Sequence, residues 1–287
     1  MIYISTGGVG SQPAWQTSSR WFEDGIKNIE LSGGAYDPDQ LSQLKRLKCK
    51  INFQLHNYFP PQSIPFVFNL ASLDYEVGKK SFQHVEKAME WSIELDQPRF
   101  GFHAGFLIDP KVNELGQRIK SRDLFDRHEA LSLFLERVNR LSEIASKLGV
   151  QLLIENNVLS ANNYREFNAN PFLMATPEEC VEVMQQTPDN VGLLIDVAHL
   201  KVSAQSINFD PILMLSMCSG WIGGYHLSDN DGLSDSNDPI THESWFWPHI
   251  KRDIDYYTVE VYGLTPSQLC QQQLIVQHQI EKSYGNI

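Results

Sequence analysis

The run Leu193-Leu194-Ile195-Asp196 places a carboxylate directly after three branched apolar residues. An apolar run that ends on a residue able to bind a metal recurs at Phe53-Gln54-Leu55-His56, Phe100-Gly101-Phe102-His103, Leu152-Leu153-Ile154-Glu155, Gly224-Tyr225-His226 and Thr258-Val259-Glu260. A buried strand needs apolar residues along its length, but it needs no imidazole or carboxylate at its last position. These six occurrences therefore indicate that the ends of the strands converge on one site.

Eight short apolar or β-branched runs alternate with segments of helical length. The runs cover residues 2–6, 28–32, 51–56, 99–103, 150–155, 191–196, 222–227 and 257–261. Each run is short enough for a strand and too hydrophobic for an exposed one, as in parallel strands that are covered on both faces. Apolar residues at helical spacing predict helices over residues 79–97 and 123–148. Gly149 predicts the end of the second helix, and Thr176-Pro177 and Thr265-Pro266 predict two further helix starts.

Eight strand–helix units in succession predict an α/β fold of the (β/α)8 TIM-barrel type, a parallel eight-stranded barrel surrounded by helices. A doubly wound open sheet is the alternative. It is disfavoured because Gly7-Gly8-Val9-Gly10 does not complete a G-x-G-x-x-G motif, since position 13 is Pro. The chain has 287 residues and no Ser/Gly/Pro-rich linker. We therefore expect residues 1–287 to form a single TIM-barrel domain.

Composition limits the classes of partner. The formal net charge of -12 disfavours a protein that tracks a phosphate backbone, so a nucleic acid is a disfavoured partner. The four cysteines form no CxxC pair, which is typical of reduced thiols in a cytoplasmic protein. The sequence shows no secretory leader and no apolar run near the roughly 18 residues that span a bilayer, so we expect no membrane association. Assembly into a homo-oligomer is left open.

The strand-terminal residues form a candidate metal set at the C-terminal face of the barrel, where such barrels carry their sites. Glu155, Asp196, His226 and Glu260 offer three carboxylates and one imidazole nitrogen, which suit Mn²⁺, Zn²⁺, Mg²⁺ or Co²⁺. Without a cation, three converging carboxylates would repel one another. Any one such residue alone is more often structural, so it is the repetition that favours a site. Gly101 and Gly224, two residues before His103 and His226, indicate a cavity beneath these ligands.

Two further features carry expectations. Glu30 lies in the second apolar run, and we expect it to face inward and to hold a neighbouring side chain in place. Asp229, Asp231, Asp235 and Asp238 form an acidic loop after His226. Most of these aspartates are expected to be solvated turn residues. Asp229 is the expected exception, because it lies three positions after His226.

The chain resembles the xylose isomerase-like TIM barrels, a superfamily of sugar isomerases, ketose 3-epimerases, hydroxypyruvate isomerase-like proteins and endonuclease IV-type abasic-site nucleases. The resemblance covers about residues 2–262. It is most specific in Leu194-Ile195-Asp196-Val197-Ala198-His199 and Tyr225-His226-Leu227-Ser228-Asp229-Asn230-Asp231-Gly232, and less so in Asn28-Ile29-Glu30-Leu31-Ser32 and Val259-Glu260-Val261.

In the isomerase and epimerase branches, the resemblance implies that Glu155, Asp196, His226 and Glu260 hold one divalent metal. Glu155 and Glu260 would also be the catalytic acid/base pair, passing a proton through an enediolate of a sugar or related polyhydroxy-carbonyl compound. His199 would contact this small-molecule substrate. This branch is the favoured interpretation, and a metal-dependent isomerase or epimerase is the predicted function.

In the nuclease branch, the resemblance implies that His56, His103 and His199 join the other ligands in a multi-zinc cluster for phosphodiester hydrolysis. The Asp-x-His of that branch is absent, and its nearest counterpart is Asp238-Pro239-Ile240-Thr241-His242. His56 and His103 have a second interpretation, in which they line the pocket and hydrogen-bond substrate hydroxyls. The sequence thus leaves substrate binding and a second metal open for these histidines. A barrel that binds a carbohydrate without turnover is disfavoured by the complete set of four ligands.

Overall fold

The computed structural model describes residues 1–114 and 119–282. The expected domain of residues 1–287 includes residues 115–118 and 283–287, which lie outside the described residues. In chain order, the elements are β1 (Ile2–Ser5), α1 (Ala14–Glu23), β2 (Asn28–Leu31), α2 (Gln40–Leu47), β3 (Asn52–His56), α3 (Tyr75–Glu94), β4 (Arg99–His103), a 3-10 turn (Val112–Glu114), α4 (Arg127–Leu148), β5 (Gln151–Glu155), α5 (Ala161–Phe167), α6 (Pro177–Met184), β6 (Val191–Asp196), α7 (Val197–Ile207), α8 (Pro211–Met217), β7 (Ile222–Leu227), β8 (Tyr257–Val259) and α9 (Pro266–Glu281).

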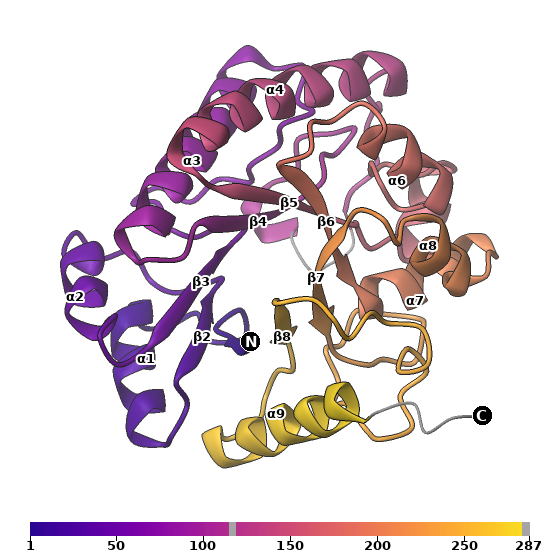
Figure 1. Cartoon of the computed structure of the whole chain (residues 1–287). Coiled ribbons are helices and arrows are strands. Elements are labelled where there is room, and N and C mark those ends of the chain that lie inside the picture. Colours follow the sequence, from indigo (N-terminus) through magenta and orange to yellow (C-terminus); the bar gives the residue numbers. More distant parts are fainter. Residues whose placement is uncertain (115–118, 283–287) are drawn as a thin grey trace.

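The strands form a closed barrel in sequence order, and β8 pairs with β1 to complete it. Every pair of neighbouring strands is parallel. Figure 1 shows the helices arranged around the outside of the strands. This architecture confirms the predicted (β/α)8 barrel. The helices bury the outer face of the strands and side chains fill the inner face, which explains why the runs are apolar along their whole length.

Two helices begin at other residues than the apolar spacing predicts, because an aspartate side chain caps each of them. The helix expected over residues 79–97 is α3, which begins at Tyr75 because the Asp74 side chain accepts hydrogen bonds from the first turn. The helix expected over residues 123–148 is α4, which begins after Asp126 for the same reason.

Other helix boundaries agree with the sequence. Gly149 follows α4 with a φ of 69°, a left-handed conformation that glycine adopts at low cost. Thr176 and Thr265 cap α6 and α9 as expected, and Thr265 completes a reciprocal capping box with Gln268.

One strand–helix unit departs from the expectation. Residues 228–256, between β7 and β8, contain no helix, so the prediction of a helix after every strand is wrong here. The segment is rich in Asp, Asn, Gly and Pro, which favour turns. A backbone bridge between Asp229 and Asp238 closes its first part, and the Gln272 side chain of α9 accepts a hydrogen bond from Ile240 N.

The lower interior of the barrel is filled by Tyr3, Leu153, Leu194 and Tyr256, each at most 1% exposed. A Cβ at Gly224 would lie 2.3 Å from Tyr256 Cδ1, and one at Gly101 would lie 3.0 Å from Leu194 Cδ2. The prediction that these glycines leave a cavity is therefore wrong. They make room for two large side chains, which form a floor beneath the strand-terminal ligands. No helix among the described residues has the length and apolarity needed to cross a membrane.

Candidate metal centre

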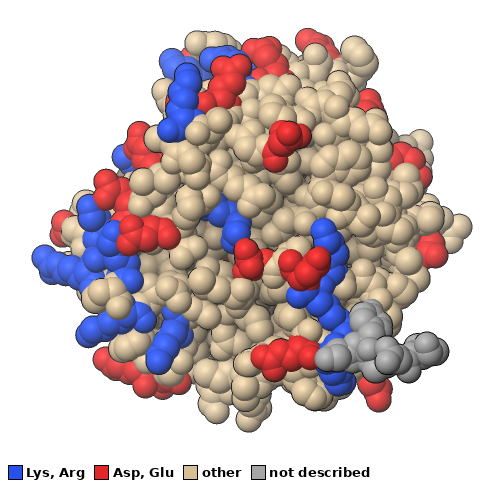
Figure 2. All heavy atoms as spheres, in the orientation of Figure 1, with Lys and Arg blue, Asp and Glu red and all other residues tan. Residues whose placement is uncertain are grey.

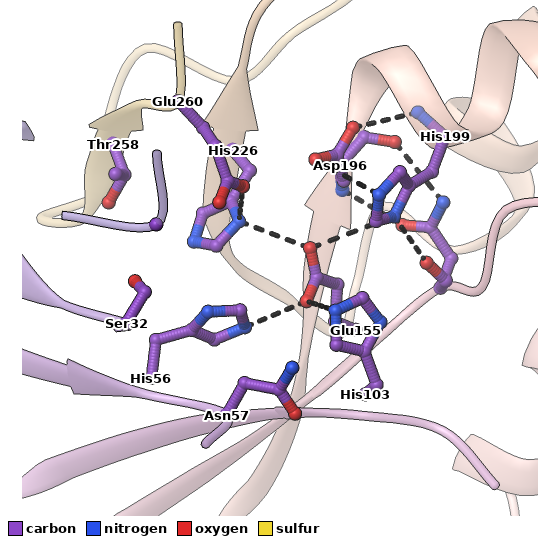
Figure 3. Close-up of polar contacts among 12 residues, drawn as sticks. Ser32, His56, Asn57, His103, Glu155, Asp196, His199, His226, Thr258 and Glu260 are labelled. Carbon is purple, nitrogen blue, oxygen red and sulfur yellow. Dashed lines mark hydrogen bonds and ion pairs between the residues drawn. The ribbon is translucent and has the colours of Figure 1, made fainter. Parts of the chain in front are cut away.

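Four of the sequence-predicted residues meet at the C-terminal end of the barrel. Glu155, Asp196 and His226 end or nearly end β5, β6 and β7, and Glu260 directly follows β8. One ligand atom from each of the four lies within 4.8 Å of the others. The His226 Nδ1 atom lies 3.1 Å from Glu155 Oε1 and 2.7 Å from Glu260 Oε2 (Figure 3). The structure thus brings together the complete predicted set.

The polar atoms of this cluster are suited to a shared cation. Asp196 Oδ2 is buried and has no hydrogen-bond partner, whereas Glu155 Oε1 and His226 Nδ1 are buried and make their short polar contacts within the cluster. A buried polar atom without a partner costs about 1–3 kcal/mol, and more when the group is charged. A divalent cation would satisfy oxygen and nitrogen atoms of this kind at once. We therefore conclude that the residues fit a divalent metal.

Electrostatics agrees with that fit. Burial, together with the repulsion from Asp235, Glu155 and Glu260, raises the pKa of Asp196 to about 7, although His199 opposes this. Burial alone would lower the pKa of His226, but Glu30, Glu260 and Glu155 raise it well above its usual range. Without a metal, Asp196 and His226 therefore hold protons more tightly than they would in water. The proton on Asp196 reduces the repulsion among the carboxylates, and the proton on His226 gives these carboxylates a positive partner. Metal binding would displace these protons.

Local backbone structure orients Asp196. Its Oδ1 atom accepts a hydrogen bond from His199 N at 2.8 Å and caps α7, which begins directly after β6. The Asn156 side chain holds the same residue through its backbone, accepting from Asp196 N at 2.8 Å and donating to Asp196 O at 3.1 Å. The capping geometry turns the second oxygen, Oδ2, toward the cluster.

His56 and His103 form a second grouping with Glu155. The Glu155 Oε2 atom lies 2.7 Å from His56 Nε2 and 3.2 Å from His103 Nε2. Figure 3 shows the Glu155 carboxylate between His226 and these two histidines. Burial lowers the pKa of His103 to about 4, so that its imidazole is neutral near pH 7, the form that binds metals. Glu155 therefore belongs to both groupings through different oxygens.

His199, on the first turn of α7, has a partner at each ring nitrogen. Nδ1 lies 3.0 Å from the carbonyl oxygen of Asn156, and Nε2 lies 3.2 Å from Asp235 Oδ2. The ring also lies close to His103, with 5.4 Å between centroids. His199 is thus near the cluster, in contact with a loop that follows β7.

In the acidic loop that follows β7, Asp235 is the aspartate that reaches the site, through His199. The expectation that Asp229 would be the exception is wrong, because Asp229 Oδ1 pairs with Lys201 Nζ at 2.7 Å. Asp235 could not be recognised from the sequence, since it stands among turn-forming residues with no apolar pattern to orient it.

Glu30 faces inward, as expected, and contacts a predicted ligand. Its Oε2 atom lies 3.0 Å from His226 Nε2. Burial would raise the pKa of Glu30, but the imidazoles of His226 and His56 and the hydroxyl of Tyr256 lower it to about 2. Sequence reasoning missed Tyr256 and Thr258, which also bond to Glu30.

Glu260 is held by residues that the sequence did not single out. Tyr262 donates a hydrogen bond to Glu260 Oε1 at 2.9 Å, and the Ser5 hydroxyl donates to the same oxygen at 3.4 Å. The Tyr262 side chain lies against Gly7 and Gly8, where an added Cβ would lie 2.5 and 2.8 Å from its atoms. Glycines in this first loop therefore admit an aromatic side chain that fixes Glu260.

Comparison with known proteins places these residues in a family context. The model of the xylose isomerase-like TIM barrel family matches residues 22–257. No curated protein sequence matches the chain. Among solved structures, a D-tagatose 3-epimerase-like protein is similar, with a TM-score of 0.72 and 17% identity over 98% of this chain and 97% of that chain.

Two further structures show the same fold. A protein from Thermus thermophilus, soaked with zinc chloride, has a TM-score of 0.63 and 21% identity over 96% of this chain and 98% of its own. An AP endonuclease of family 2 from Brucella melitensis has a TM-score of 0.63 and 15% identity over 94% of this chain and 96% of its own. The family match covers most of the chain, and the closed barrel agrees with it. The chain belongs to the xylose isomerase-like TIM barrel family.

Proposed function

We propose that this protein is a divalent-metal-dependent isomerase or epimerase of a sugar or related polyhydroxy-carbonyl compound. The observation that carries the proposal is the placement of Glu155 and Glu260. These two carboxylates come from β5 and from the end of β8, and both approach His226 Nδ1, at 3.1 and 2.7 Å. Two acid/base groups beside one cation site suit the removal and return of a proton on the carbon next to a carbonyl. The similarity to a D-tagatose 3-epimerase-like protein supports the same interpretation.

Glu155, Asp196, His226 and Glu260 would hold the metal. When bound, it would stabilise negative charge on the carbonyl and neighbouring hydroxyl oxygens of the substrate. One glutamate would remove the proton from the carbon next to the carbonyl. For epimerisation, the other would return a proton to the opposite face of the resulting enediolate. Ser5 and Tyr262 would hold Glu260 in position for this transfer.

The burial of this pair suits the chemistry. Glu155 is 0% and Glu260 7% exposed. Water is therefore largely kept from both carboxylates, which strengthens electrostatic interactions and limits loss of the abstracted proton. His199 is 5% exposed and lies on the Asp196 side of the cluster, where we propose that it contacts the substrate.

The decisive experiment is exchange of solvent deuterium into ketoses by the metal-loaded protein. We expect exchange at the carbon next to the carbonyl with the wild type. E155Q and E260Q should lose turnover by about 10²- to 10⁴-fold, the usual value of an acid/base group. E136Q is a matched control, since the Glu136 side chain is 60% exposed on α4. Full activity of either site variant would contradict the acid/base assignment.

Metal-dependent phosphodiester hydrolysis is a second candidate, and the grouping of His56, His103 and Glu155 favours it, because a second metal could bind there. On the face drawn in Figure 2, basic and acidic residues are interspersed and form no continuous basic track. Metal analysis separates the candidates. About one equivalent per chain is expected for the isomerase or epimerase, and about two to three zinc ions for the hydrolase. Nicking of abasic DNA without deuterium exchange would overturn the first proposal.

A further inference from the structure

Glu30 is a buried carboxylate beside the proposed metal centre. It lies near the end of β2 and is 0% exposed. One of its oxygens lies within 4.8 Å of ligand atoms on His56 and His226, so these three residues also resemble a metal site. The hydrogen-bond donors around Glu30 indicate whether it binds a metal or instead positions a neighbouring side chain.

Three donors converge on a single oxygen of Glu30. The hydroxyl of Tyr256 donates to Oε2, the hydroxyl of Thr258 donates to it at 2.7 Å, and His226 Nε2 lies 3.0 Å away. The other oxygen, Oε1, accepts from the Ser32 hydroxyl at 2.8 Å. Ser32 and Thr258 lie beside His56 and His226 in Figure 3. A carboxylate oxygen has two lone pairs, so Oε2 has none left for a cation.

The contact with His226 has a defined direction. Tyr256 and Thr258 use their single hydroxyl protons on Oε2, and a carboxylate accepts, so the Nε2 atom of His226 must carry a proton and donate it. The opposite ring nitrogen, Nδ1, faces Glu155 and Glu260. The contact with His56 is weaker, because its Nδ1 atom lies 3.9 Å from Glu30 Oε1, beyond hydrogen-bond distance.

We propose that Glu30 is a positioning residue of the metal centre. It holds His226 as the tautomer protonated on Nε2 and thereby presents Nδ1 to the metal held with Glu155, Asp196 and Glu260. Carboxylates that accept from the far nitrogen of a metal-binding histidine fix its ring and raise its basicity. In this proposal the grouping of Glu30, His56 and His226 is an outer support of the metal centre. This inference rests on the metal-binding part of the proposed function.

Metal affinity tests the proposal without reference to turnover. We would titrate metal-stripped wild type, E30Q and E30A with Zn²⁺ and with Mn²⁺ by calorimetry, after circular dichroism has verified folding. The affinity of both variants should fall by about 10- to 100-fold, the usual effect of such partners. E136Q and E136A are the matched controls, because the Glu136 side chain is 60% exposed on α4, away from the metal centre, and both variants should bind metal like the wild type. Wild-type affinity in E30Q and E30A would overturn the proposal, as would the loss of one metal equivalent at unchanged affinity.

A second measurement needs no substitution and so remains decisive if the Glu30 variants fail to fold. Long-range proton–nitrogen correlation spectra of zinc-loaded wild type should show His226 protonated at Nε2, with Nδ1 bound to zinc. The reverse arrangement would overturn the proposal.

The outcomes distinguish this inference from the function itself. Metal binding without action on ketoses would refute only the function. Unchanged binding by E30Q and E30A would refute only the role of Glu30. A wild type that binds no metal would refute both.

Discussion

Asp196 makes two separable contacts with its two carboxylate oxygens. Oδ1 caps α7 by accepting from His199 N at 2.8 Å, whereas Oδ2 is buried without a hydrogen-bond partner and belongs to the proposed metal centre. D196N keeps an oxygen for the cap but places an amide nitrogen, a donor, in the metal centre. D196A removes both contacts. This pair of variants therefore separates metal binding from helix capping.

The expected change in the free energy of unfolding with pH follows from the pKa of Asp196. Its pKa is raised from 3.8 to about 7, chiefly by burial. The folded protein thus binds this proton more tightly than the unfolded chain, so the stability contributed by Asp196 falls as pH rises from about 4 to about 7. About three pH units at about 1.36 kcal/mol each set an upper limit of about 4 kcal/mol for the metal-free protein. D196N has no such proton and should lack this decline.

Urea unfolding followed by circular dichroism, at pH 5 and pH 8 in the presence of EDTA, measures these differences. At pH 8, D196N should be more stable than the wild type, and D196A should be less stable than D196N by about 1 kcal/mol, the usual value of an N-cap. In a second series without EDTA, free Zn²⁺ at about a hundredfold excess over its Kd should stabilise the wild type by about 2.7 kcal/mol and leave both variants almost unchanged. The reasoning is refuted if wild type and D196N share one pH dependence, or if zinc stabilises them equally.

Two further predictions concern the barrel itself. G224A should lower the free energy of unfolding by about 1–3 kcal/mol, since its Cβ would lie 2.3 Å from Tyr256 Cδ1 in the buried floor. Urea midpoints measure this change. G220A is the control and should show no comparable loss, because Gly220 has open space around it. T265A should destabilise by about 1 kcal/mol, because it removes the side-chain cap of α9. The exposed first-turn variant S267A should change stability by less than about 0.5 kcal/mol, and an equal loss in both variants would argue against the capping assignment.

The sequence predicted the barrel well because its main determinant is local. An apolar run of about five or six residues is recognisable as a buried strand from its own composition, and so is a polar residue at its end. All the expected runs became strands, and Glu155, Asp196, His226 and Glu260 meet as expected. The unit after β7 was predicted wrongly, since counting strands says nothing about whether a helix follows each one.

Other parts of the site depend on the closure of the barrel. Glu30 and Tyr256 are 226 positions apart, and they meet only because β8 pairs with β1, which pairs with β2. Asp235 reaches His199 from a loop without a periodic pattern. The glycines at positions 101 and 224 suggested empty space, whereas Leu194 and Tyr256 occupy it from other parts of the barrel.

The sequence by itself thus determined which residues end the strands with metal-binding chemistry, because strand periodicity and residue type are written locally. Only the tertiary structure decided which way each ligand faces and what supports it. His226 shows the difference. Its presence near the end of β7 is evident from the sequence, but the direction of its two nitrogens depends on Glu30 on one side and on Glu155 and Glu260 on the other. Those three carboxylates come from distant parts of the chain, and only the closed barrel brings them around one imidazole.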